Sequence, residues 1–261
     1  MKIPKSHPRY ASLVTREKLV RAWRDGVVVP EGLIAHGRGE AWDYLLGEAT
    51  SAPALVAEKA AAAFLLRARR PVISVNGNVA ALAGRDVVRL ARAIPARIEV
   101  NLFHRSEARV RRILRLLKRA GASDVLGPRP NAKIPGLESK RALSHRSGVY
   151  GADVVLVPLE DGDRVEALTR MGKVVISVDL NPLSRTSQTA SVPVVDELRR
   201  ALRNLEKFTR ELHRDPVETE RIAREYGKAG NLQAMYSFLG WRVRELSRCM
   251  RGGKRRRRRI K

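Results

Sequence analysis

Short runs of β-branched and other apolar residues alternate with longer segments of helical periodicity through the middle of the chain. Such short runs, closed by polar or glycine-containing turns, are typical of buried strands, whereas apolar residues at i, i+3, i+4 and i+7 indicate amphipathic helices. Their alternation predicts a parallel α/β sheet with right-handed crossovers and helices on both faces. The predicted strands are 71–75, 98–102, 125–126, 153–157, 174–178 and 192–195.

The predicted helices are recognised by their capping residues as well as by their periodicity. Thr15 is expected to cap a helix that Gly26 stops. Asp163 and Glu166 have the spacing of a capping box for a short helix. The expected helices are 15–25, 51–69, one that follows Asn78, one from Ser106 to Gly121, 137–146, 163–171 and, with interruptions near 215–216 and 227–230, the segment from 197 towards the C-terminus.

The chain divides by composition into three parts. Residues 1–197 are expected to form the α/β domain, with a polar arm at its start, and 198–250 a helical extension. Residues 251–261 are dominated by arginine and predict a disordered basic tail.

Charge is the largest anomaly of the composition. The 261 residues hold 52 Lys and Arg against 27 Asp and Glu, a net charge of +25. Such a protein attracts phosphate groups of any kind, so a nucleic-acid-binding protein is one alternative. We find no helix-turn-helix, zinc-finger or RNP pattern, and aromatic residues are only 5% of the chain. Nucleic acid is therefore expected to bind weakly at most, through the basic tail.

Other features limit the compartment and the chemistry. A single cysteine, Cys249, excludes an internal disulfide and a cysteine-based metal cluster. No apolar run approaches the roughly 20 residues of a membrane-spanning helix, and the N-terminus lacks the apolar core of a signal peptide. We therefore expect a cytoplasmic protein without a membrane partner.

Polar residues follow several predicted strands. Asn76 and Asn78 come after the first strand, His104 and Arg105 after the second, and Asp179 and Asn181 after 174–178. Carboxyl ends of parallel strands meet at one edge of a sheet, where ligands bind. We therefore expect these residues to converge on one crevice, although an ordinary polar loop is an equally simple interpretation of each exit.

The stretch His36-Gly37-Arg38-Gly39 precedes a helical pattern. Glycines before a helix leave backbone N–H groups open to an anion, so the stretch predicts an anion-binding turn, or else an exposed glycine-rich turn. Its spacing is not GxGxxG, because Trp42 stands where the third glycine would be. This counts against a second alternative, an NAD-dependent oxidoreductase. GxxxxGK[ST] is absent from the chain.

Six blocks of the sequence, taken together, resemble one family. In order, they are IPKSHPRYASLVTRE, GLIAHGRGEAWDYLLGE, PVISVNGNVAAL, EVNLFHRSEARV, DVVLVPLEDGDRVEAL and ISVDLNPLSRTSQTA. They are similar to the archaeal phosphopantothenate synthetases, also called 4-phosphopantoate–β-alanine ligases, over about residues 3–197. The resemblance implies a Rossmann-like homodimer that joins 4-phosphopantoate to β-alanine on the route to coenzyme A. ATP is consumed, and AMP and pyrophosphate are released.

The resemblance also implies the residues that bind ATP. They are Arg16, Arg38, Asp179, Leu180, Asn181, Arg185, Thr186, Asp196 and Glu197. The family often carries Asn at the position of Glu197, on the adenine side.

The chemistry that the resemblance implies gives several residues a role. An acyl-adenylate forms when the substrate carboxylate attacks ATP, and arginines such as Arg38 neutralise the two anions. Mg²⁺ is expected to bridge phosphate oxygens, and no residue is assigned as its ligand. Capping is the expected role of Asp163, and the alternative is that Asp161 or Asp163 binds the nucleotide-bound Mg²⁺. His36 and His104 are candidate bases for the β-alanine amine, or ligands for the substrate phosphate. The residues expected on the phosphopantoate side are Asn76, Asn78, His104 and Arg105.

Overall fold

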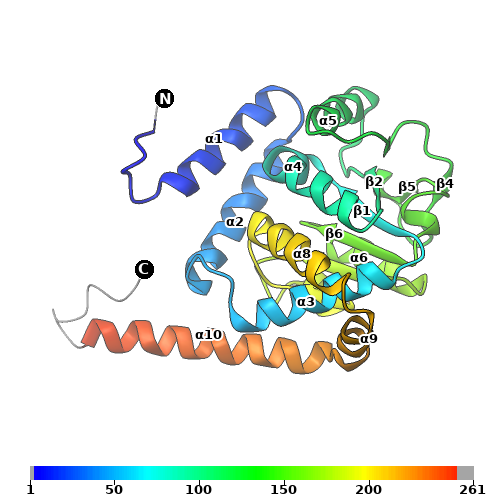
Figure 1. The fold of residues 1–261 in the computed structure, drawn as a ribbon. Coiled ribbons are helices and arrows are strands. Elements are labelled where there is room, and N and C mark those ends of the chain that lie inside the picture. Colours follow the sequence, from blue (N-terminus) through cyan, green and yellow to red (C-terminus); the bar gives the residue numbers. More distant parts are fainter. Residues whose placement is uncertain (1–2, 252–261) are drawn as a thin grey trace.

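The computed structural model describes residues 3–251. Nearly all of the predicted basic tail, 251–261, lies outside these residues. The core is a six-stranded parallel sheet in the order β3-β2-β1-β6-β7-β8 (Figure 1). Counted within this sheet alone, the order is 3-2-1-4-5-6, that of a doubly wound Rossmann-like fold, which confirms the predicted class. The strands are β1 (Pro71–Val75), β2 (Arg97–Val100), β3 (Val125–Leu126), β6 (Val154–Pro158), β7 (Val174–Val178) and β8 (Val192–Val194).

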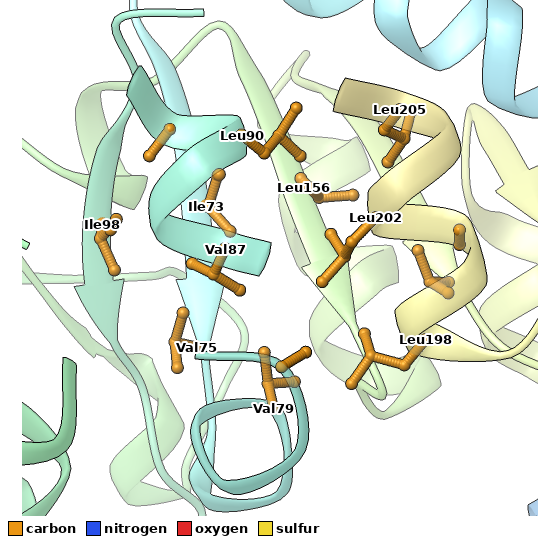
Figure 2. Close-up of a cluster of buried hydrophobic side chains, with 14 of the residues drawn as sticks. Ile73, Val75, Val79, Val87, Leu90, Ile98, Leu156, Leu198, Leu202 and Leu205 are labelled. Carbon is orange, nitrogen blue, oxygen red and sulfur yellow. The ribbon is translucent and has the colours of Figure 1, made fainter. Parts of the chain in front are cut away.

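Helices cover both faces of the sheet, and side chains alternate between the two. Ile73 and Val75 enter the larger core cluster, while Val72 enters a second cluster on the other face. Figure 2 shows the larger cluster, where Leu90 and Leu202 of two neighbouring helices meet strand residues. The helices on this face are α3 (Ala52–Arg67), α4 (Gly77–Ala93), α5 (Glu107–Arg119) and α8 (Leu198–Leu212), and those on the other are α6 (Gly162–Arg170) and α7 (Arg185–Thr189).

The C-terminal helices pack on the α/β body. Leu198, Leu202 and Leu205 of α8 belong to the main core, so the core continues across the predicted boundary at residue 198. Two further helices, α9 (Pro216–Glu225) and α10 (Lys228–Arg251), follow. Met235 of α10 is buried beside Leu46 and Val195, so its first half closes the end of β8. Figure 1 shows the second half of α10 running past the body of the fold.

Several predicted helix boundaries are confirmed. Ser51 and Ser106 each occupy an N-cap, as predicted, and each side chain accepts a hydrogen bond from a backbone N–H of the first turn. Asn76 caps α4 in the same way, so this helix begins at Gly77, earlier than predicted. Gly26 and Gly121, with φ of +66° and +98°, stop the two helices that precede them. These signals are local, which is why the sequence alone places them.

The first helix begins earlier than predicted. α1 spans Tyr10–Arg24, and Thr15 lies inside it, where its hydroxyl donates to the carbonyl of Ala11 at 2.9 Å. The N-cap, Arg9, makes no side-chain capping bond. Ser12 and Arg16 on this helix instead donate to Glu40 of the next one. Tertiary contacts, rather than a cap, therefore hold the first turn.

The helix predicted over 137–146 is wrong. This segment holds the 3₁₀ turn η1 (Lys140–Ala142) and the short strand β5 (Leu143–Ser144). β5 pairs antiparallel with β4 (Ala132–Lys133), which precedes the segment, and a second 3₁₀ turn, η2 (Val149–Gly151), follows it. The buried carboxylate of Glu99 accepts from the Ser144 hydroxyl at 2.9 Å and from the backbone N–H of Val149 at 2.7 Å. Satisfying this carboxylate outweighs the local helical preference, because an unpaired buried charge is costly.

The predicted capping box at Asp163 is also wrong. α6 begins at Gly162, its N-cap is Asp161, and the Asp161 side chain makes no capping bond. The carboxylate of Asp161 is paired with Arg141 instead, and that of Glu166 with Arg185. Of the two residues of the predicted capping box, Glu166 is therefore taken by a long-range ion pair.

The predicted glycine-rich turn is wrong too, because His36, Gly37, Arg38 and Gly39 lie in the middle of one continuous helix. α2 spans Pro30–Leu46, with proline in its first turn and Gly47 at φ +90° as its stop. The backbone N–H groups of the stretch lie within the helix, so they do not form the open anion-binding turn that we predicted.

Replacing Gly37 with alanine tests this correction. The position is inside α2, and a methyl group there meets no atom within 4 Å. Because glycine is unfavourable in a helix interior, Gly37→Ala is expected to raise the free energy of unfolding by roughly 0.5–1 kcal/mol. Urea denaturation measures this change. A loss of stability would mean that the segment needs the freedom of a turn.

Candidate active site at the carboxyl edge of the sheet

Helix α2 crosses the carboxyl ends of the strands. Residues 31–43 of this helix span about 18 Å at 1.5 Å per residue, close to the roughly 19 Å from β2 to β8 at about 4.8 Å per strand. The helix therefore forms one wall along the edge. Four contacts of α2 follow the order of the strands. Glu31 lies near His104 after β2, and Gly32 accepts a hydrogen bond from Asn78 after β1. Gly39 lies beside Leu180 after β7, and Asp43 pairs with Arg200 next to the end of β8.

Arg16 and His36 lie together beside Glu40. The guanidinium of Arg16 donates to Glu40 Oε2 from Nε at 3.0 Å and from Nη2 at 2.5 Å. Burial pushes the pKa of Glu40 upward, but hydrogen bonds from Ser12, Arg16 and Tyr44 outweigh it and lower the pKa to about 2. Burial lowers the pKa of His36 and the charge of Arg16 adds to this effect, while the charge of Glu40 opposes it. The cluster therefore presents a cation and a neutral imidazole.

The segment after β7 is held rigidly. Asp179 Oδ1 accepts from the backbone N–H of Asn181 at 3.0 Å, and its other oxygen accepts from Ser184. Burial raises the pKa of Asp179, while these bonds and the nearby charge of Arg38 oppose the rise. The hydroxyl of Thr186 donates to the carbonyl of Glu160 at 2.7 Å. Arg38 and this segment therefore face each other across the edge.

Leu180 and Arg185 flank this segment differently. Leu180 is half-buried and packs on the small cluster around Met235, whereas Arg185 is exposed and paired with Glu166. The backbone of Arg185 is fixed, but its guanidinium is held only by the exposed ion pair with Glu166. Breaking this pair costs little, so the guanidinium is available to a ligand.

Asp196 and Glu197 stabilise the start of α8. Glu197 Oε2 accepts from the backbone N–H groups of Arg199 and Arg200, at 3.0 and 3.1 Å. Asp196 is buried and accepts from the hydroxyl of Thr50 at 2.6 Å. Their assignment to ATP remains a prediction, and the carboxylate of Glu197 is occupied by the cap.

Glu58 lies buried next to Asp196. Burial and the negative charge of Asp196 raise the pKa of Glu58 to about 9, although Asn204 donates to it at 2.9 Å. Between pH 4.5 and about 9 the folded protein holds a proton that the unfolded chain has released. The free energy of unfolding therefore falls as pH rises, by at most about 1.4 kcal/mol per unit.

Replacing Glu58 with glutamine is expected to flatten this fall, because the amide does not titrate. Unfolding by urea at pH 6, 7 and 8 compares the two proteins. An unchanged pH slope in Glu58→Gln would mean that Glu58 is ionised in the folded state.

At the part of the edge formed by β2, β1 and β6, two asparagines connect the segments that follow the strands. Asn76 donates to the carbonyl of Leu159 at 2.9 Å, which joins the exits of β1 and β6 where the strand order reverses. Asn78 donates to the carbonyl of Gly32 at 2.7 Å and so holds α2. Arg105 is buried and donates to the carbonyl of Gly127. These three groups therefore shape the edge.

His104 is about half exposed, and its ring packs against that of Phe103. Its Nε2 lies 3.8 Å from Glu31, so the imidazole is within reach of a ligand at the edge.

Sequence reasoning missed a buried group of charges at this edge. Glu160, two residues after β6, is held between Arg141 and Arg164. The sequence gives no signal for Arg141, because its segment has a helical pattern and its partners lie far along the chain.

The described residues contain no group of three or more His, Cys, Asp or Glu side chains that could hold a metal ion. Within residues 3–251, no helix is both long and apolar enough to cross a membrane.

Comparison with known proteins places this chain among relatives of one kind. The family model described as phosphopantothenate/pantothenate synthetase matches residues 53–240. A 4-phosphopantoate–β-alanine ligase of Methanospirillum hungatei is 58% identical over 215 residues, 82% of this chain and 88% of the relative. One of Methanosarcina mazei is 56% identical over 216 residues, 83% and 85% of the two chains. That of Thermococcus onnurineus is 48% identical over 250 residues, 95% of each chain.

Proposed function

The chain belongs to the phosphopantothenate/pantothenate synthetase family, and from this premise we propose that it is a 4-phosphopantoate–β-alanine ligase. The observation that carries the proposal is the identity of 48% over 95% of both chains with a relative of that name. In this proposal, the product is 4'-phosphopantothenate, an intermediate of coenzyme A biosynthesis. Neither a nucleic-acid-binding protein nor an NAD-dependent oxidoreductase finds support in the comparisons.

The reaction that we propose has two steps. A carboxylate oxygen of 4-phosphopantoate attacks the α-phosphorus of ATP, and pyrophosphate leaves. The amine of β-alanine then attacks the acyl carbon and loses a proton, and AMP leaves. 4-Phosphopantoate and ATP, which react in the first step, are both anions, so cations fixed at the edge are needed to bring them together.

We assign ATP to the side of the edge where α2 faces the segment after β7. Arg16 and Arg38 supply positive charge from α1 and α2, and Asn181 and Thr186 supply polar groups from a rigid backbone. The full proposed set is Arg16, Arg38, Asp179, Leu180, Asn181, Arg185, Thr186, Asp196 and Glu197. 4-Phosphopantoate then lies towards Asn76, Asn78, His104 and Arg105.

His36 is the better candidate for the base, with His104 as the alternative. Its lowered pKa keeps the imidazole neutral at physiological pH, which leaves it able to accept the amine proton. Protonation removes this capacity. Turnover is therefore expected to fall at acidic pH with a midpoint below 6.5, the ordinary value for histidine.

Replacing His36 with glutamine is expected to abolish this acid limb and to lower kcat by roughly 100-fold, a typical contribution of a general base. The pH profile of kcat measures both effects. An acid limb that persists in His36→Gln would assign the base to another group.

Mg²⁺ is proposed to enter with ATP. Such ions are usually held by substrate phosphates, water and one or two carboxylates, which is compatible with the lack of a dedicated cage among the described residues. The ion would neutralise phosphate charge, and the arginines of the edge position the phosphates.

We further propose a homodimer in the cytoplasm, on family resemblance. Weak binding of nucleic acid by the basic tail also remains a proposal, and that segment lies outside the described residues.

Release of AMP tests the function. Purified protein is incubated with Mg²⁺-ATP and with 4-phosphopantoate, β-alanine, both or neither. We expect AMP and 4'-phosphopantothenate only when both are present. Absence of the amide product with all reactants supplied would overturn the proposal.

A further inference from the structure

Two arginines hold one buried carboxylate where the strand order reverses. Glu160 is only 8% exposed, and its Oε1 lies 3.0 Å from Nη1 of Arg141. Its Oε2 accepts from Nη1 of Arg164, which has no exposed surface. The same nitrogen of Arg164 donates to the hydroxyl of Ser74, at 2.9 Å, near the end of β1. This Arg141–Glu160–Arg164 triad is therefore fixed at the usual ligand position of an open α/β sheet.

The triad carries an excess of positive charge, two cations against one anion. Asp161 compensates for it through an ion pair with Nη1 of Arg141, but the Asp161 side chain is 59% exposed. An exposed carboxylate is well solvated after it leaves its partner, so such a pair is weak. Asp161 thus occupies a position on Arg141 that a more highly charged anion can take.

Arg141 is placed to receive such an anion, and Arg164 lies buried behind it. Both ion pairs of Arg141 use Nη1. Its guanidinium carbon lies 5.1 Å from the centre of the Phe103 ring, after β2, within the range of a cation–π contact. Nε and Nη2 of Arg164 are buried and have no hydrogen-bond partner among the described residues. A fixed guanidinium fork is the group that proteins use to bind phosphate.

We propose that Arg141 binds the phosphate monoester of the acyl substrate, that Arg164 and Glu160 position it, and that the phosphate displaces Asp161. The inference rests on the proposed function and deepens it. Two anionic ends of one substrate need separate cations, because the carboxylate has to remain free to attack ATP. Arg38 lies across the edge near Asp179, and Arg141 supplies the second site between Phe103 and Glu160.

The first test compares substrates with and without the phosphate. Arg141→Gln is expected to lower the affinity for 4-phosphopantoate by about 100-fold, as when a charge-assisted contact is lost. Binding of unphosphorylated pantoate and of ATP is expected to stay the same, and calorimetry measures all three. Equal losses for 4-phosphopantoate and pantoate, or no loss, would overturn the assignment. Arg146→Gln, an exposed change in the same segment, is the matched control.

The second test predicts a stronger affinity for 4-phosphopantoate. Asp161→Asn removes the competing carboxylate and is expected to lower the KM for 4-phosphopantoate several-fold while pantoate is unaffected. A weaker affinity for 4-phosphopantoate in this variant would contradict the displacement. Thermal unfolding of Arg141→Gln and Asp161→Asn checks that the fold persists. If the unaltered protein forms no amide from 4-phosphopantoate, the proposed function fails, whereas calorimetry still decides whether Arg141 recognises the phosphate.

Discussion

Replacing Arg38 with alanine is expected to remove most of the ligase activity while the fold persists. The side chain is exposed, and it forms no ion pair with any residue in the described part of the chain. Its charge acts on Asp179, beside the proposed ATP segment. Loss of a cation that stabilises developing charge costs about 100- to 1,000-fold in kcat, so kcat/KM should fall by at least this factor.

Steady-state AMP release measures the effect, and urea denaturation is expected to give the same midpoint as for the unaltered protein. Arg115→Ala, which removes an exposed arginine from α5, serves as the control for net charge. Unchanged turnover in Arg38→Ala would remove Arg38 from the mechanism. A shifted midpoint would mean that it has a structural role.

Replacing Gly148 with alanine is expected to destabilise the fold severely. A methyl group at this position would overlap Oε2 of Glu99 and lie 2.8 Å from Leu126 Cδ1. Glu99 is buried, and hydrogen bonds from Asn101, Ser144, His145 and Val149 prevent it from moving aside. Overpacking of this kind combined with disruption of a buried charge is expected to cost about 3 kcal/mol or more.

The midpoint of urea unfolding measures this loss. Gly37→Ala is the matched control, because it makes the same chemical change where a methyl group meets open space. A midpoint for Gly148→Ala equal to that of the unaltered protein would mean that the segment around Glu99 adapts freely.

The strands of the main sheet and two N-caps were predictable because their causes are local. The five residues of β1 and β7 were placed correctly by β-branched content, and Ser51 and Ser106 by their hydroxyls before helical patterns. The convergence of polar exits followed from one rule, that parallel strands end at the same edge. Asp179 was singled out in this way. Arg38 was singled out by the stretch 36–39 and by the family resemblance, and its charge acts on Asp179 in the structure.

The errors arose where distant residues decide the local structure. Residues 137–146 have a helical pattern, but the buried carboxylate of Glu99 binds donors of that segment and prevents the helix. α2 appeared to be interrupted by Gly37 and Gly39, but contacts along the whole edge keep it continuous. Arg141 was missed for the same reason, since its partner Glu160 lies 19 residues further along the chain.

The packing of α8 has a consequence for synthesis of the protein. α8 is one wall of the main core, against α3 and α4, yet it comes after every strand in the chain. A chain of residues 1–197 has α3, α4 and α5 on this face of the sheet, but it leaves exposed the apolar surface that Leu198, Leu202 and Leu205 of α8 cover in the complete fold. Folding of the α/β body is expected to finish only after residue 212 has emerged, and a fragment that stops at 197 should aggregate when it is expressed.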